Sequence, residues 1–221
     1  QPVKIDPGFA RAHAGLSFTH FQNAFLGFSP DREAEMLKMR AHAVRGLERD
    51  ALDPFVNLTM GRTEWLDNDL DAALPWIERS IELSPNYAFA IYNSALVGTL
   101  LGDGKSGETR VTKAISLSPI DPLNYAMLAT RALSHAVGGD FVSASDWAAS
   151  AVRSPNAHVQ IYAIAAFAHE LIGDRVKAQG YVEQLRRRRP DYSKSDFLKS
   201  FPFRDAKTFA QIEQSLQRLG L

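Results

Sequence analysis

The chain contains no cysteine, which excludes disulfide bonds, cysteine metal sites and thiol catalysis together. It also lacks an excess of either charge, because 25 lysines and arginines balance 25 aspartates and glutamates. A neutral balance gives no electrostatic reason to favour nucleic acid or an anionic membrane as a partner. Apolar runs such as residues 161–168 fall well short of the roughly 20 residues that a membrane span needs. Hydrophobic residues still make up 45% of the sequence, which is enough to build a buried core.

A short motif recurs along the chain at a nearly constant spacing. It places aspartate, serine or arginine before proline, and successive prolines are 31 to 36 residues apart. The motif occurs at Asp53-Pro54, Ser84-Pro85, Ser118-Pro119, Ser154-Pro155 and Arg189-Pro190. This period predicts an array of helix pairs, because each pair exposes an apolar face that only the next pair can cover. A capping side chain before proline suits a helix N-terminus, so each motif is predicted to begin the first helix of a pair.

Candidate turns lie midway between these motifs. They fall at residues 67–69, 102–104, 138–140 and 173–174, which are rich in glycine, asparagine and aspartate. Glycine permits the backbone conformations that a tight turn requires. The alternation of the two kinds of boundary predicts two helices in each unit.

The fifth unit carries the most specific pattern. A small-residue pair at Ala165-Ala166 is followed by Gly173, by Ala178 five residues later and by Pro190 twelve residues after that. This spacing resembles the tetratricopeptide repeat (TPR), and residues 60–85 repeat most of it. The resemblance implies an all-α fold, a right-handed α-α superhelix of about five helix pairs with a C-terminal capping helix.

The expected array covers residues 1–200. Its units are placed at roughly 6–53, 54–85, 86–119, 120–155 and 156–190, and residues 201–221 form a tail with the capping helix. Within the units, small residues are expected where two helices approach closely, at Gly61, Ala73, Ala95 and Ala178.

The first unit and the tail depart from the repeat. Residues 21–29 are predicted to form a long connection, after which Ser29-Pro30 begins a helix that runs to about Leu52. After Pro190 the repeat lapses, and an amphipathic helix follows. Its apolar face contains Phe209, Ile212, Leu216 and Leu219, and it is expected to cover the last repeat, whose apolar side would otherwise be exposed.

A narrower resemblance covers nearly the whole chain. Residues 6–16, the long first hairpin, residues 118–123 and the closing segment 201–205 look like the C-terminal TPR region of certain bacterial regulators. These are class III adenylate or guanylate cyclases and winged-helix transcriptional regulators, in which the catalytic or DNA-binding domain precedes the repeats. The resemblance implies a cytoplasmic, soluble piece of a longer bacterial signalling protein. It carries no cyclase residue over to this chain.

Three other features could indicate chemistry, and each has a simpler interpretation. Residues 104–106 read Gly-Lys-Ser but lack the preceding glycine and strand of a phosphate-binding loop, so a turn is favoured. The six histidines include no pair at the i, i+4 spacing of a helical zinc site. The arginines at 186–189 could bind phosphate or acidic peptide, but a solvated helix C-terminus is favoured. No catalytic, cofactor or metal residue is predicted.

The remaining candidate site is the concave surface that the first helices line in TPR proteins. The resemblance places the following side chains toward that groove as partner-binding residues: Phe55, Leu58, Arg62, Trp65, Tyr92, Asn93, Leu96, Thr99, Leu133, Phe167 and Glu170. Apolar and aromatic groups of this kind anchor protein partners. The same stripe could instead be packing core or be covered by the C-terminal tail.

The sequence therefore predicts a noncatalytic scaffold for protein–protein interaction. Its partner is expected to be a protein or peptide, with self-association possible, and no nucleic acid or membrane span is expected for this chain. The alternative is that it forms part of an adenylate or guanylate cyclase, or of a DNA-binding regulator, whose active domain lies outside these 221 residues.

Overall fold

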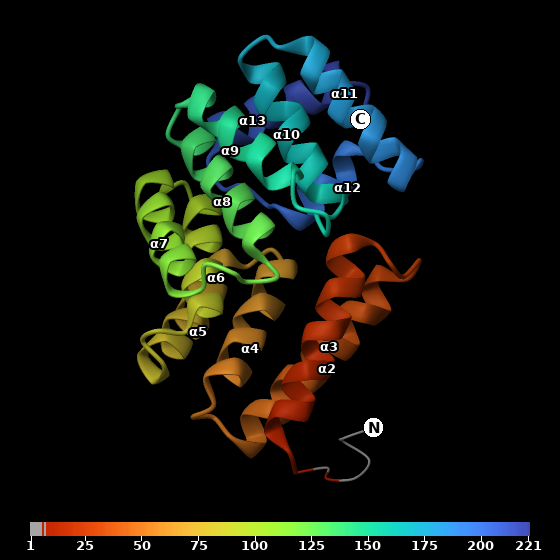
Figure 1. Cartoon of the computed structure of the whole chain (residues 1–221). Coiled ribbons are helices and arrows are strands. Elements are labelled where there is room, and N and C mark those ends of the chain that lie inside the picture. The colour runs from red at the N-terminus through yellow and green to blue at the C-terminus, as the bar shows by residue number, and fades with distance from the viewer. Residues whose placement is uncertain (1–5, 7) are drawn as a thin grey trace. The chain divides into compact units, whose positions relative to one another are not determined.

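The computed structural model describes residue 6 and residues 8–221, and within them the chain forms α-helices and no strand. Five consecutive helix pairs are followed by two further helices (Figure 1). The pairs are α2 (Ala10–Leu26) with α3 (Arg32–Arg49), α4 (Pro54–Leu66) with α5 (Leu70–Leu83), α6 (Ala88–Leu100) with α7 (Gly104–Leu117), α8 (Asn124–Val137) with α9 (Phe141–Val152), and α10 (Val159–Leu171) with α11 (Arg175–Arg188). The two closing helices are α12 (Lys194–Ser200) and α13 (Ala206–Arg218). The predicted all-α fold of five helix pairs with a C-terminal helix is confirmed.

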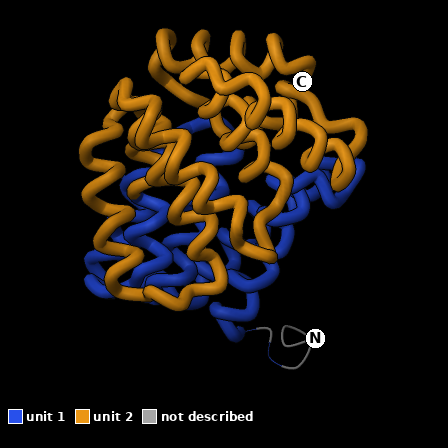
Figure 2. The backbone as a smooth tube through the Cα atoms, turned by 45° about the horizontal axis from the view of Figure 1, so that its top comes forward, with its two compact units in different colours: residues 1–94 blue, residues 95–221 orange. Residues whose placement is uncertain are grey.

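The chain divides into two compact units, residues 1–94 and residues 95–221, which Figure 2 colours separately. In unit 1, α2 packs on α3 and on α4, and α4 packs on α5. In unit 2, α8 packs on α9 and on α10, and α10 packs on α11 and α13. Helices α2 and α8 therefore each contact their own second helix and the first helix of the next pair, as stacked hairpins require.

The turn inside each later hairpin follows one rule. A residue with positive φ is followed directly by an aspartate that caps the second helix: Asn68 before Asp69, Gly102 before Asp103, Gly139 before Asp140, and Gly173 before Asp174. Each aspartate side chain accepts a hydrogen bond from the backbone N–H three residues on, at 3.0 to 3.2 Å. The left-handed conformation reverses the chain, and the carboxylate satisfies a free N–H at the new helix end. The predicted midway turns are confirmed.

The predicted role of the Ser-Pro motifs is wrong. Only Asp53-Pro54 begins a helix, with Asp53 as the N-cap and proline in the first helical turn. Ser84, Ser118 and Arg189 instead cap the C-termini of second helices. At all four later motifs the residue before proline accepts a hydrogen bond from the N–H three residues on, in Ser84–Tyr87, Ser118–Asp121, Ser154–Ala157 and Arg189–Tyr192. Proline thus occupies the second position of a β-turn, which its fixed φ favours, and the next helix begins only after that turn.

The first hairpin also differs from its prediction. Residues 21–26 continue helix α2, and the connection is confined to residues 27–31. Gly27 ends α2 in the left-handed conformation (φ 67°), and Asp31, rather than Ser29, caps α3. Helix α3 ends at Arg49 rather than near Leu52. Phe21 and Phe25, which fall in the predicted connection, are buried residues of α2.

The segment after the fifth hairpin contains one helix that the sequence pattern missed. Helix α12 is only seven residues long and begins with a capping box between Ser193 and Asp196. Its Phe197 is fully buried and contacts Phe167 of α10, with ring centroids 5.7 Å apart. Helix α13 buries Ile212 and Leu216, as predicted. Both helices pack within unit 2, and α13 contacts α10.

Close approaches between helices explain several small residues. A Cβ added to Gly61 would lie 2.6 Å from the Ile77 side chain and 2.9 Å from the Ala73 carbonyl oxygen. Ala178 is fully buried and packs with Ala166. Side chains larger than these would separate the paired helices.

Gly104 is the tightest backbone contact of this kind in the described residues. A Cβ there would lie 2.4 Å from the Ser134 carbonyl oxygen and 3.0 Å from the Gly138 nitrogen, both backbone atoms of the neighbouring α8 segment. Because backbone cannot rotate away, Gly104→Val is expected to lower the free energy of unfolding by about 2 to 3 kcal/mol in urea denaturation. Lys105→Val, at the exposed next position, is the matched control and should change it by less than about 0.5 kcal/mol. Equal stabilities of the two variants would contradict this packing.

Candidate functional site

Unit 1 gathers five half-buried aromatic rings, which we call the aromatic surface. It comprises Phe18 of α2, Phe55 of α4, Tyr87 of the turn before α6, and Phe89 and Tyr92 of α6. The ring centroids of Phe18 lie 6.3 Å from Phe55 and 5.9 Å from Phe89, and Phe89 lies 6.1 Å from Tyr92. These separations are typical of interacting aromatic pairs. The first helices of the first three pairs therefore bring one continuous group of rings together.

A buried cation lies beneath these rings. The Arg62 guanidinium of α4 lies 3.6 Å from the ring centroid of Phe21, 4.7 Å from Phe18 and 5.3 Å from Phe89. Cation–π attraction is strongest where the cation is removed from water, and Arg62 is only 6% exposed. Arg62 therefore fixes the positions of the rings and makes the electrostatic potential beneath them positive.

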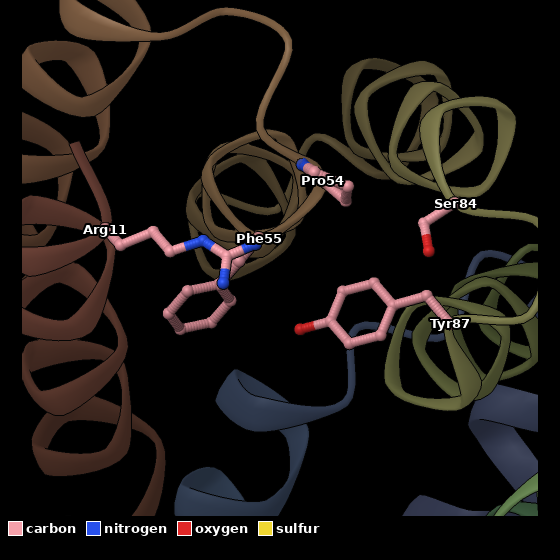
Figure 3. Close-up of a pocket in the computed structure, with 5 residues that line it drawn as sticks. All are labelled: Arg11, Pro54, Phe55, Ser84 and Tyr87. Carbon is pink, nitrogen blue, oxygen red and sulfur yellow. The ribbon is translucent and has the colours of Figure 1, made fainter.

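A pocket of about 240 Å³ adjoins the aromatic surface. Its lining residues are Arg11, Pro54, Phe55, Ser84 and Tyr87, all within unit 1 (Figure 3). The local folding rules described above place them: Pro54 opens α4, and Ser84 and Tyr87 are the ends of one β-turn. The pocket is smaller than the roughly 300 to 1,000 Å³ typical of small-molecule sites, and suits a side chain better than a cofactor.

The charged group of the pocket is held in place by the helix cap. Arg11 Nε donates to Asp53 Oδ2 at 2.5 Å, while Asp53 Oδ1 accepts from the Phe55 and Val56 backbone N–H groups. The hydrogen bond to Asp53 raises the pKa of Arg11. Burial raises the pKa of Tyr87 to about 12. At neutral pH the pocket therefore presents a permanent cation and a neutral phenol, and neither titrates in the range that general acid–base catalysis uses.

The structure places two of the eleven predicted groove residues, Phe55 and Tyr92, in the aromatic surface. The other nine are buried within the chain, each at most 6% exposed: Leu58, Arg62, Trp65, Asn93, Leu96, Thr99, Leu133, Phe167 and Glu170. Most of their interactions are those of a packed interior; Trp65, for example, contacts the rings of Phe21 and Phe25. Glu170 differs, because its carboxylate lies 3.7 Å from Arg175 Nε and 3.8 Å from Arg218 Nη1 and lines a second pocket of about 210 Å³ within unit 2. That these nine bind a partner stays a prediction, and their burial leaves little of each side chain to contact one.

Six residues of the aromatic surface and its pocket are absent from the predicted groove residues: Arg11, Phe18, Pro54, Ser84, Tyr87 and Phe89. A usable signal was present, because an aromatic residue follows the proline closely in both Pro54-Phe55 and Pro85-Asn86-Tyr87. The sequence pattern of residue-before-proline motifs predicts a helix start and gives no role to the aromatic residue that follows. Pro85 lies in a β-turn, and Tyr87 is the last residue of that turn. Tyr87 therefore stands directly before the start of α6.

The other chemical candidates have structural roles. Gly104, Lys105 and Ser106 begin α7 directly after the α6 hairpin turn, with Asp103 as the cap, so the context of a phosphate-binding loop is missing. Within residue 6 and residues 8–221, no group of three or more histidine, aspartate or glutamate side chains is placed to hold a metal ion. None of the helices in that part of the chain is long and apolar enough to cross a membrane.

Three of the four consecutive arginines are engaged within unit 2. Arg186 donates to the Gly220 carbonyl oxygen, and Arg189 donates to Asp196 at 2.9 Å. Arg188 donates to the Gln184 carbonyl oxygen, and its guanidinium stacks on the Tyr162 ring at 4.1 Å. A cationic side chain on a free carbonyl near a helix C-terminus is the arrangement that the helix dipole favours.

The first hairpin contains a row of three imidazoles that the scattered sequence positions did not suggest. His13 Nδ1 lies 3.1 Å from His42 Nδ1, and the His20 ring stacks on His42 with centroids 5.8 Å apart. His20 Nδ1 lies 2.7 Å from Glu35 Oε2. Burial, with the nearby charges of His13, His20 and Arg45, lowers the pKa of His42. The hydrogen bond from His20 is the main reason that the pKa of Glu35 falls to about 2.

These shifts predict a stability that decreases in acid. A lowered histidine pKa means that the fold favours neutral His42, so its contribution is complete above the unfolded value of about 6.5 and is lost as the pH falls below it. Urea denaturation between pH 7.5 and 5 should therefore show falling stability, with a shallower slope for His42→Gln. Identical slopes for wild type and His42→Gln would contradict the assignment.

No protein-family model and no curated protein matches the sequence. Solved structures do match. PilW, a widely conserved type IV pilus biogenesis factor, is similar with a TM-score of 0.64 and 17% identity over 92% of this chain and 90% of PilW. PilF of Pseudomonas aeruginosa has a TM-score of 0.58 and 16% identity over 89% and 83%.

MamA of Desulfovibrio magneticus is similar as well, with a TM-score of 0.55 and 15% identity over 82% of this chain and 98% of MamA. These are TPR proteins, and identities this low show the fold and nothing finer. The chain has the helical-repeat fold of TPR proteins.

Proposed function

We propose that this chain is a noncatalytic protein-binding scaffold that engages its partner through the aromatic surface of unit 1. The observation that carries the proposal is the gathering of five half-buried rings from three successive hairpins beside a small pocket. Aromatic side chains and arginine are the residues that contribute most to protein-binding energy. The TPR fold of the chain supports a scaffold role, since its similar structures belong to proteins of that kind.

A direct test is site-specific photo-crosslinking in the cells from which the chain comes. The photoreactive amino acid p-benzoylphenylalanine, incorporated in place of Phe55, is expected to give a discrete higher-mass adduct with one partner. The same amino acid at Leu37, which is 72% exposed on α3, is the control and should give none. Adducts of equal yield at both positions, or an adduct at Leu37 alone, would contradict the proposed surface.

We also propose that the chain is the regulatory repeat region of a larger bacterial signalling protein. The sequence resemblance to the repeat regions of cyclases and winged-helix regulators supports it, and it includes a cytoplasmic location and a separate active domain. Residues 201–205, which carry part of that resemblance, contribute to the fold: Phe201 and Phe203 are buried, and Asp205 caps α13. The genomic reading frame upstream of Gln1 tests the context. A cyclase or DNA-binding domain there would support it, and an unrelated domain would exclude it.

A further inference from the structure

The pocket of unit 1 contains hydrogen-bond donors that find no acceptor among residue 6 and residues 8–221. Asp53 already accepts three hydrogen bonds, from Arg11 Nε and from two backbone N–H groups. Arg11 is therefore held by one nitrogen only. In the part of the chain that the structure describes, its two terminal nitrogens, Nη1 and Nη2, donate to no acceptor. Its side chain is 61% exposed, so a binding partner can reach it.

The Tyr87 hydroxyl is the second such group. The residue is half-buried, yet among residue 6 and residues 8–221 its Oη has no hydrogen-bond partner. Its raised pKa keeps the phenol protonated at neutral pH, so it can donate. Figure 3 shows the Arg11 guanidinium and the Tyr87 hydroxyl pointing toward the same space across Phe55, with Ser84 at the side.

The hydrogen-bond donors and the apolar walls of this pocket indicate which kind of ligand it can bind. A carboxylate accepts charge-assisted hydrogen bonds from a guanidinium and a phenol, and these are about twice as strong as bonds to a neutral acceptor. A lysine or arginine would be repelled by Arg11 and by buried Arg62. The Pro54 and Phe55 walls add an apolar contact beside the donors. The volume of about 240 Å³ limits the occupant to one or two side chains.

We propose that this pocket receives the aspartate or glutamate side chain of an extended partner segment, with an apolar residue next to it against Pro54 and Phe55. The inference rests on the proposed protein-binding function and specifies the chemistry of the partner. Arg11 acts as the charged anchor, Asp53 orients it through Nε, and Tyr87 supplies the second donor.

A random peptide library with blocked, amidated C-termini tests the inference on the full 221-residue chain. Wild type is expected to enrich peptides that carry an acidic residue beside an apolar one. The affinity of an enriched peptide should fall about tenfold with Arg11→Gln and severalfold with Tyr87→Phe, as expected for loss of a charged and a neutral hydrogen bond. Arg45→Gln, the same change at an exposed position of α3, should leave the affinity unchanged.

The Tyr87→Phe variant separates an effect on binding from an effect on folding. Within residue 6 and residues 8–221 the hydroxyl has no hydrogen-bond partner, so its removal should leave the melting temperature unchanged or slightly raised while binding weakens. Enriched peptides without an acidic residue, or full binding by Arg11→Gln, would overturn the inference and leave the scaffold function standing. In a parallel library with free carboxyl termini, binding only by those peptides would assign the pocket to a chain end instead. No enrichment by wild type would contradict both proposals.

Discussion

Replacing Ala178 with arginine is expected to destabilise the fifth hairpin more than any surface change can. Ala178 is fully buried where α11 packs on α10, in a cluster with Ala166, Val182 and Leu219. Arginine there would add volume to a closed contact and place a charge with no partner in the interior. We expect a loss of about 3 to 5 kcal/mol in the free energy of unfolding, measured by urea denaturation.

The control for this change lies two residues away on the same helix. Val176 is 87% exposed, so Val176→Arg adds the same side chain in water and should alter stability by less than about 0.5 kcal/mol. The pair separates burial from helix propensity, because both changes introduce arginine into the same turn of α11. Equal effects of the two variants would show that α11 does not pack by the face that the structure assigns.

The second large effect is expected for Trp65. Its indole is 2% exposed and lies 5.2 Å from the Phe21 ring centroid and 5.5 Å from Phe25. Trp65→Ala should cost about 3 to 5 kcal/mol, the range for removing a large buried aromatic ring. Changing half-buried Phe55 of the same helix to alanine should lower the free energy of unfolding by only about 1 kcal/mol. Thermal and urea unfolding of the two variants compare them directly.

This contrast also determines which variants can report on binding. Loss of partner binding by Trp65→Ala or Phe167→Ala would reflect a damaged core, since both rings are buried. A Trp65→Ala variant as stable as Phe55→Ala would contradict the distinction between core and aromatic surface.

The hairpin architecture could be predicted from the sequence because its signals are local. Glycine or asparagine before aspartate encodes both the chain reversal and the cap of the next helix, as at Gly173-Asp174. The amphipathic pattern of α13 likewise identified Ile212 and Leu216 as its buried face. The role of Pro85 could not be predicted in this way. A serine before proline is compatible with a helix N-cap and with a β-turn, and the choice depends on where Ser84 ends α5.

The site was less predictable for a different reason. Membership of a first helix predicts proximity to the groove, but the exposure of a side chain depends on which neighbours cover it. Leu58 and Phe55 are three residues apart on α4, yet Leu58 is fully buried and Phe55 is half-buried. The pocket also needs Arg11 from α2 and Tyr87 from a turn, positions that no spacing rule joins.

The most direct test of the central claim is the affinity of the crosslinked partner for wild-type chain and for Phe55→Ala, measured by calorimetry on purified proteins. The account predicts binding at least about tenfold weaker for Phe55→Ala, with a circular dichroism spectrum that shows an intact fold. Val176→Ser in unit 2, at an exposed position, should bind as wild type does. Equal affinities of wild type and Phe55→Ala would contradict the assignment of partner binding to the aromatic surface.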